Sequence, residues 1–140
     1  GMKILQFAFD SREESDYLPH NYTHNCVVYT GTHDNDTVMG WYGTLKGADK
    51  KLCDDYLRLK NADGEPIPRE QLPWEFVRAA MSSVADLAII PMQDYLGLGS
   101  EARINIPSTL GINWKWRMGN GDFTKELAGR IRSMTKLYGR

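Results

Sequence analysis

Apolar residues gather in three short runs along the chain, and polar residues, glycine or proline bound each run. The runs cover residues 3–10 (KILQFAFD), 25–30 (NCVVYT) and 87–90 (LAII). Short, nearly continuous apolar runs rich in β-branched and aromatic residues are typical of strands buried on both faces of a parallel sheet. The sequence therefore predicts three such strands, with a polar loop over residues 11–23 between the first two.

Helical spacing replaces these runs after the second predicted strand. From Thr37 onward, apolar residues recur three or four positions apart, notably Leu52, Tyr56 and Leu59, while charged residues occupy the opposite face. This pattern is typical of amphipathic helices. We expect one or two helices here, followed by a loop over residues 61–73, because that stretch contains a glycine and three prolines.

A further helix is expected over residues 74–84 (WEFVRAAMSSV), with Phe76, Ala80 and Val84 turned towards the core. The third strand follows it. Residues 97–118 are then punctuated by glycine and proline, and they hold two tryptophans. Long loops with aromatic residues are often functional, so this stretch is expected to be a loop that contributes to a site.

The end of the chain predicts a C-terminal amphipathic helix. Asp122 is expected to cap its N-terminus, and the helix should end near Gly139, a residue type that is common just past a helix. The residues that form its apolar stripe are Phe123, Leu127, Ile131 and Met134.

The order of these elements indicates an α/β fold. Strands that alternate with helices are typical of parallel βαβ units. Three strands that must be buried on both faces cannot form a complete barrel by themselves. A full (β/α)8 barrel needs about 250 residues. We therefore expect residues 1–140 to be a single unit that is part of a larger barrel.

The composition of the chain limits the classes of molecule that are expected to bind to it. Hydrophobic residues make up 41% of the chain and charged residues 25%, which is ordinary for a globular domain. Seventeen basic and 18 acidic residues give a net charge of -1, so neither nucleic acid nor an anionic membrane surface is an expected partner. With no long apolar run or signal-like N-terminus, the expected location is the cytoplasm.

The sequence also indicates the state of the two cysteines and the origin of the first residue. Cys26 and Cys53 have no metal-ligand spacing and are too few for a disulfide framework, so both are expected to be reduced, buried thiols. Gly1 before Met2 resembles the scar of a cleaved expression tag.

Polar residues with catalytic chemistry follow the second predicted strand. His33, Asp34, Asn35 and Asp36 lie just beyond NCVVYT, and in a parallel barrel the carboxyl ends of strands carry the active site. A structural role competes with this one, because Asn35 or Asp36 can cap a helix that starts near Thr37. Asp34 lies too early to cap that helix. We expect Asp36 to be the cap, and Asp34 and His33 to be functional.

Several segments together resemble a known family. Residues 29–37 (YTGTHDNDT), preceded by LQFAFD and YLPHNY, are similar to the 4-alpha-glucanotransferases (amylomaltases or disproportionating enzymes) of the α-amylase superfamily. Residues 91–107 (PMQDYLGLGSEARINIP) and 113–118 (NWKWRM) resemble that family's closing segments in the same order. The resemblance covers nearly the whole chain. It implies the C-terminal part of a catalytic (β/α)8 TIM barrel, with the sixth, seventh and eighth strands, their helices and a C-terminal helix.

The resemblance also implies a reaction. Enzymes of this family transfer α-1,4-glucan segments to malto-oligosaccharides or glucose by a retaining mechanism, with no dissociable cofactor and no metal. Its nucleophile and acid/base lie about 5 to 5.5 Å apart across the scissile bond, and they come from the fourth and fifth strands. Asp34 matches the third carboxylate, which stabilises the transition state, and His33 matches a histidine that binds sugar hydroxyls. The chain alone is expected to be inactive.

Other residues are weaker candidates for substrate binding. Gln93 and Asp94 follow the third strand, where they either reach a substrate or serve as a cap or buried polar group. Asn105 lies in a segment that resembles the family's mobile loop on the acceptor side. Arg103 beside Glu101 is expected to form an ion pair on that loop.

The tryptophans have two interpretations. Trp114 and Trp116 alternate, so in an extended segment they share a face and could stack on pyranose rings, although packing into the core is the more common role and is the one expected here. Trp41 is expected in the core. His20 and His24 are not expected to bind metal, because no carboxylate motif accompanies them.

Two other functions stay open from the sequence. The chain could be a non-catalytic glucan-binding or structural module whose aromatic loops hold sugar. It could also associate with a second copy, because three parallel strands leave an open strand edge on each side.

Overall fold

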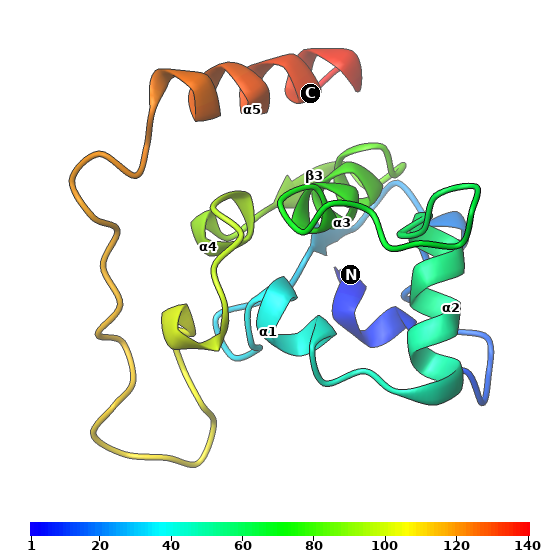
Figure 1. Ribbon diagram of the computed structural model, residues 1–140, viewed down its shortest axis with the longest axis horizontal. Helices are drawn as coiled ribbons and strands as arrows, with labels where there is room; N and C mark the ends of the chain where they lie inside the picture. Colours follow the sequence, from blue (N-terminus) through cyan, green and yellow to red (C-terminus); the bar gives the residue numbers. More distant parts are fainter.

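The computed structural model describes residues 1–140 and contains a three-stranded parallel sheet in the order β1-β2-β3. The strands are β1 (Met2–Ile4), β2 (Val27–Tyr29) and β3 (Leu87–Ile89). The three predicted strands and their parallel arrangement are confirmed, although each is shorter than its apolar run. Helical segments separate the strands along the chain and lie beside the sheet (Figure 1), which confirms the α/β class.

The first predicted strand is wrong beyond Ile4. Residues Leu5–Ala8 form a short 3-10 helix instead. Leu5, Ala8 and Phe9 all lie in the same buried cluster, and their spacing of three and four residues suits a helical turn rather than a strand, in which neighbouring side chains alternate between faces. The chain therefore leaves the sheet early and turns towards the helices.

Three helices connect β2 to β3, namely α1 (Val38–Tyr42), α2 (Gly47–Leu57) and α3 (Leu72–Met81). They enclose the main hydrophobic core together with the 3-10 turn after β1 (Figure 1). Trp41 packs against this core, as expected. The buried members of the core are Leu5, Ala8, Phe9, Leu18, Val38, Met39, Cys53, Leu57, Leu59, Leu72 and Phe76.

Helix α3 begins earlier than its apolar pattern predicts. Leu72 is its first residue and Pro73 lies in its first turn, where a missing N–H group costs nothing because that group has no partner inside the helix. Phe76 and Ala80 are fully buried, as expected, but Val84 lies beyond the end of the helix and is 45% exposed. The inward placement of Val84 is therefore wrong.

Helix α5 (Lys125–Leu137) starts later than expected. Its N-cap is Thr124, whose hydroxyl accepts a hydrogen bond from the Leu127 N–H at 3.1 Å. The predicted cap, Asp122, instead accepts a hydrogen bond from the Gly119 N–H at 2.7 Å and closes the turn before the helix. Phe123 consequently precedes the helix and is exposed, so its place in the apolar stripe is wrong.

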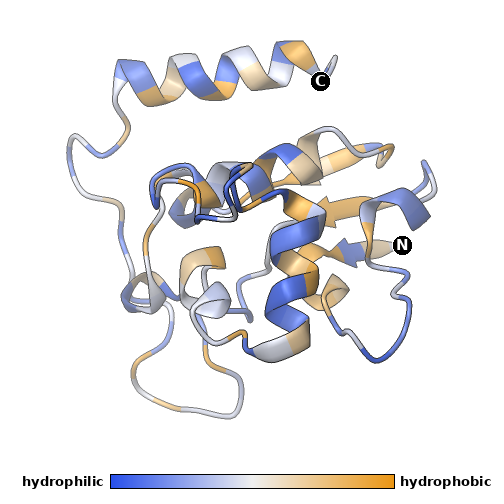
Figure 2. Cartoon of the chain, turned by 45° about the vertical axis from the view of Figure 1, so that its right-hand side comes forward, coloured by the Kyte–Doolittle hydropathy of each residue, from blue (hydrophilic) through white to orange (hydrophobic).

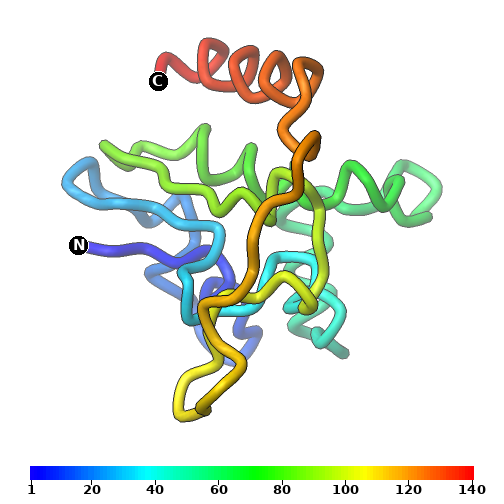
Figure 3. Tube along the Cα trace, turned by 90° about the vertical axis from the view of Figure 1, so that its left-hand side faces the viewer, coloured from blue at the N-terminus to red at the C-terminus, as the bar shows by residue number.

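The rest of that stripe packs as predicted. Leu127, Ile131 and Met134 lie against a cluster on α3 that contains Trp74 and Met81, and apolar and polar residues alternate along α5 (Figure 2). A long segment without regular structure leads from the short 3-10 turn Ser100–Ala102 to this helix along the outside of the molecule (Figure 3).

One face of the sheet is buried by other residues, whereas the opposite face is partly exposed to solvent. Lys3, Val28 and Ala88 are neighbours in one row, and Val28 is fully buried. Side chains of the adjacent rows point to the opposite face, where Leu87 and Ile89 are exposed. An apolar surface of the sheet thus lies open on β3, at one of its two free strand edges.

Two simpler observations complete the fold. Cys26 and Cys53 are buried free thiols, as expected. None of the helices combines the length and the apolar character that crossing a membrane would require.

Candidate functional site

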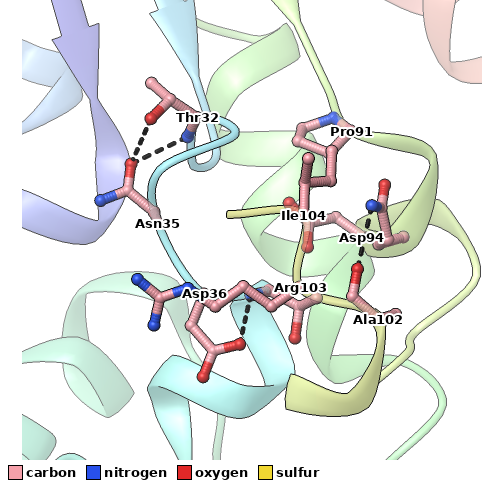
Figure 4. A pocket seen from close by; sticks show the side chains of 10 residues that line it. Thr32, Asn35, Asp36, Pro91, Asp94, Ala102, Arg103 and Ile104 are labelled. Carbon is pink, nitrogen blue, oxygen red and sulfur yellow. Dashed lines mark hydrogen bonds between the residues drawn. The ribbon is translucent and has the colours of Figure 1, made fainter. Parts of the chain in front are cut away.

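The polar residues after β2 form a turn at the carboxyl edge of the sheet. The amide oxygen of Asn35 closes this turn, because it accepts hydrogen bonds from the Thr32 N–H at 2.9 Å and from the Thr32 hydroxyl at 2.8 Å (Figure 4). His33 and Asp34 lie between these two residues at the tip, and both side chains are about half exposed. The turn therefore presents an imidazole and a carboxylate at the place where the sequence predicts a site.

His33 and Asp34 contact each other and Asn105. The His33 Nε2 atom lies 3.4 Å from Asp34 Oδ1. The Asn105 amide donates a hydrogen bond to the same Asp34 Oδ1 at 2.7 Å, and the Asn105 N–H donates to the His33 carbonyl at 3.1 Å. The structure thus brings together three of the residues that the sequence singles out, although Asn105 follows Asp34 by 71 positions.

Arg103 fastens the same segment to the turn. Its guanidinium donates to the Asp34 carbonyl at 2.7 Å and to the Asn105 carbonyl at 2.9 Å. The predicted ion pair with Glu101 is wrong, because the Glu101 carboxylate accepts a hydrogen bond from the nearby Gly99 N–H at 2.9 Å. The planar array of donors on arginine suits a bridge between two carbonyl groups.

Asp36 is not the helix cap. The N-cap of α1 is Thr37, whose hydroxyl accepts from the Gly40 N–H at 3.1 Å. One Asp36 carboxylate oxygen accepts from the Thr37 N–H at 2.8 Å, and the other accepts from the Ser100 hydroxyl at 2.6 Å. Asp36 therefore ties the turn after β2 to the segment that carries Arg103, which is a tertiary role that helix-capping preference does not reveal.

A second carboxylate, Asp94, lies beneath the turn and is only 1% exposed. It belongs to the short helix α4 (Met92–Tyr95) and accepts hydrogen bonds from the Thr30 hydroxyl at 2.5 Å and the Val38 N–H at 2.8 Å. Burial raises the pKa of Asp94 to about 6, against the opposing effect of these two hydrogen bonds. Of the two roles open from the sequence, the buried polar group is confirmed for Asp94.

Gln93 is also buried, and its amide donates to the Ala102 carbonyl at 3.1 Å. The bond fixes the start of the segment that leads to Arg103 and Asn105. Gln93 nevertheless lines the same hollow as His33 and Asp34. Its contact with a substrate stays a prediction.

We call this hollow the strand-end hollow. Its volume is about 450 Å³, which is within the range of small-molecule sites. A much smaller cavity of about 10 Å³ lies beneath the turn (Figure 4), with room for about one water molecule. The strand-end hollow is lined by Met2, Tyr29, Gly31, Thr32, His33, Asp34, Ile89, Pro91, Met92, Gln93 and Ile104.

Trp114 lies beside this hollow. It is 57% exposed, so its expected role in core packing is wrong, and its ring centroid lies 5.1 Å from that of His33. Trp116 is partly buried. Alternation along the chain predicts a shared face for the two tryptophans, and only the tertiary structure shows that Trp114 is exposed while Trp116 is partly buried.

The site combines hydrogen-bonding groups with one accessible carboxylate. His33, Asn105 and Asp34 offer donors and acceptors of the kind that bind hydroxyl groups, and the Asp34 carboxylate can stabilise positive charge that develops nearby. Asp36 and Asp94 are engaged in the hydrogen bonds described above. No cluster of three or more histidine, cysteine, aspartate or glutamate side chains is arranged to hold a metal ion.

Comparison with known proteins identifies relatives along the whole chain. The family model described as 4-alpha-glucanotransferase matches residues 1–122. The chain is 50% identical to the 4-alpha-glucanotransferase of Clostridium butyricum, of which it covers 28%. It is 47% identical to that of Thermus thermophilus over 97% of this chain and 27% of the relative. The chloroplastic/amyloplastic 4-alpha-glucanotransferase of Solanum tuberosum is 48% identical over 24% of its length.

A solved structure agrees with these relatives. Amylomaltase from Streptococcus agalactiae, solved in complex with acarbose, superposes with a TM-score of 0.89 and 35% identity over 100% of this chain and 27% of its own. The chain thus spans about a quarter of the proteins that it matches. Neither the C-terminal position in the barrel nor the cytoplasmic location is confirmed, and the potato relative is a plastid protein by name. Sequence and structure together show that the chain belongs to the 4-alpha-glucanotransferase family.

Proposed function

We propose that this chain supplies part of the active site of a 4-alpha-glucanotransferase, which transfers α-1,4-glucan segments between malto-oligosaccharides or to glucose by a retaining mechanism. The observation that carries the proposal is the contact of Asp34 with both His33 and Asn105 at the rim of the strand-end hollow. Family membership supports the same reaction. No dissociable cofactor is needed for it.

In this proposal Asp34 stabilises the oxocarbenium-like transition state. A carboxylate that is already oriented needs little rearrangement when positive charge develops on the sugar ring. The Asn105 amide, at 2.7 Å from Asp34 Oδ1, fixes one carboxylate oxygen. His33 and Asn105 bind sugar hydroxyls, and Gln93 reaches the substrate from the wall of the hollow.

We also propose that β1, β2 and β3 are consecutive strands of a (β/α)8 barrel, which makes residues 1–140 one part of that domain. The open strand edges and the exposed Leu87 and Ile89 support this, because neighbouring strands of a closed barrel would cover both. The order of the motifs after β2 and β3 favours the last three strands.

The chain alone should not catalyse transfer. Retaining chemistry needs two further carboxylates, a nucleophile and an acid/base, about 5 Å apart. Asp36 is bound to Ser100, and Asp94 is buried beneath the turn. Neither is free to attack a sugar, so both reacting groups are expected to come from outside these residues.

The test combines this chain with the remaining barrel, either as a second polypeptide or by extending the gene. The complete enzyme should release glucose from maltotriose. Asp34→Asn should lower the rate by about a hundredfold or more, because it removes the negative charge that stabilises the transition state. Asp63→Asn, at an exposed position in another loop, is the control and should leave the rate unchanged. Equal activity of the Asp34→Asn variant would rule out the assigned role.

A non-catalytic glucan-binding module is the second candidate, and the exposed Trp114 beside the hollow favours it. It is distinguished by full turnover of the complete enzyme without Asp34, since binding of maltoheptaose by this chain alone is compatible with both candidates. Self-association through the open strand edges is a separate proposal. A monomeric scattering profile at high protein concentration would exclude it.

A further inference from the structure

Trp114 differs from Trp41 and Trp74 because more than half of its surface is exposed to solvent. Trp41 packs against the main core and Trp74 lies under α5. Trp114 is 57% exposed, although burying so large an apolar side chain would be favourable. An exposed tryptophan is not by itself a binding site, but Trp114 also has a strained backbone and contacts a residue of the site.

The backbone of Trp114 is held in an unfavourable conformation. Its φ is 64°, in the left-handed region that bulky side chains rarely adopt because of clashes with the backbone. The Trp114 N–H donates to the Ile104 carbonyl at 2.7 Å, and the Trp114 carbonyl accepts from the Arg117 guanidinium at 3.1 Å. Strain of this kind persists where surrounding contacts impose it, and it gathers at ligand-binding sites.

These contacts connect Trp114 to the site in two ways. Its ring lies beside that of His33, with centroids 5.1 Å apart and a tilt of 38°. The carbonyl that holds its N–H belongs to Ile104, which lines the strand-end hollow and precedes Asn105. The indole is therefore fixed at the rim of the hollow, next to the residues that contact Asp34.

We propose that Trp114 is a stacking platform for a glucose ring of an α-1,4-glucan, next to the ring that His33 and Asp34 bind. A pyranose has hydroxyls around its edge and C–H groups on its faces, so it matches an exposed aromatic plane beside hydrogen-bonding groups. The inference rests on the proposed function and adds to it a subsite with an apolar floor. A fixed backbone orients the indole before the sugar arrives, which lowers the entropy lost on binding.

The experiment measures maltoheptaose binding to the full 140-residue chain by calorimetry, so that the loss of a tryptophan does not remove the signal. Trp114→Ala should weaken binding about tenfold, because the aromatic plane that contacts one face of the sugar is lost. Trp114→Phe should keep most of the affinity, because it keeps an aromatic face. Trp116→Ala is the matched control from the same segment and should bind like the wild type.

The outcomes separate this inference from the proposed function. Thermal unfolding of Trp114→Ala should match that of the wild type, because the side chain is exposed. Wild-type affinity in Trp114→Ala would overturn the platform and leave the transfer activity untouched. Absence of binding by the wild-type chain would also overturn it, whereas the Asp34→Asn rate in the complete enzyme tests the proposed function independently.

Discussion

Asp94 gives the sharpest test of how the site is supported. It accepts hydrogen bonds from the Thr30 hydroxyl after β2 and from the Val38 N–H at the start of α1, so it joins the strand to the helix on either side of the turn that carries His33 and Asp34. Asp94→Asn keeps the size and one acceptor oxygen but cannot ionise. Comparing this variant with the wild type therefore isolates the titration of one buried carboxyl group.

The magnitude follows from the pKa of Asp94. Burial raises it from 3.8 to about 6 in the folded chain. Between these two values the folded state holds a proton that the unfolded state has released, so protonation stabilises the fold, and this contribution is lost as pH rises through 6. Linkage over that shift predicts that the free energy of unfolding of the wild type, relative to Asp94→Asn, is greater by about 2 kcal/mol at pH 4.5 than at pH 7.

Urea unfolding followed by circular dichroism at both pH values measures the difference. Other titrating groups cancel, because the two proteins differ only at residue 94. Asp63→Asn on its exposed loop serves as the control and should change stability by less than about 0.5 kcal/mol at either pH. A substitution penalty that is equal at the two pH values, or larger at pH 7, would refute the raised pKa of Asp94.

Gly40→Ala and Arg103→Ala test the contacts that hold the site, and Gly129→Ala is a control for the first. Gly40→Ala places a Cβ 2.3 Å from the Ser100 hydroxyl oxygen, and this overlap should lower the free energy of unfolding by about 1 to 3 kcal/mol. A Cβ at Gly129 in α5 meets no atom within 4 Å. Gly129→Ala should therefore raise the free energy of unfolding by about 1 kcal/mol in the same urea assay. If both glycines respond alike, the close approach of the two segments is wrong. Arg103→Ala removes the bridge to the Asp34 carbonyl, and hydrogen exchange of the Asn105 amide should become about tenfold faster, since the segment opens more often; unchanged exchange would show that Arg103 does not fasten it.

The sequence predicts the parts of the fold that depend on neighbouring residues. The apolar runs locate three parallel strands, and helical spacing locates the stripe of α5 that packs on α3. Ends of elements are less predictable because caps compete locally. Thr37 and Thr124 cap their helices where Asp36 and Asp122 are expected, since both aspartates bind elsewhere.

The site divides in the same way. The position of His33 and Asp34 follows from the strand that precedes them, and the family resemblance points to Asn105. The roles of Asp94 and Arg103 depend on partners 56 to 69 positions away. Periodicity and capping preference depend only on residues that are close in sequence. Neither can therefore reveal the hydrogen bond from the Val38 N–H to Asp94 or the one from Arg103 to the Asp34 carbonyl.

The segment between the turn Ser100–Ala102 and α5 is attached to the molecule at both of its ends. Ser100 bonds to Asp36 at one end, and beyond the other the Arg140 guanidinium donates to the carbonyls of Met81 and Ser83. A chain that is pinned at two points has far fewer conformations than a free tail of equal length. Helix α5 thus acts as an anchor for this segment. Without it the segment would adopt more conformations, and the Asn105 amide would bond to Asp34 for a smaller fraction of the time.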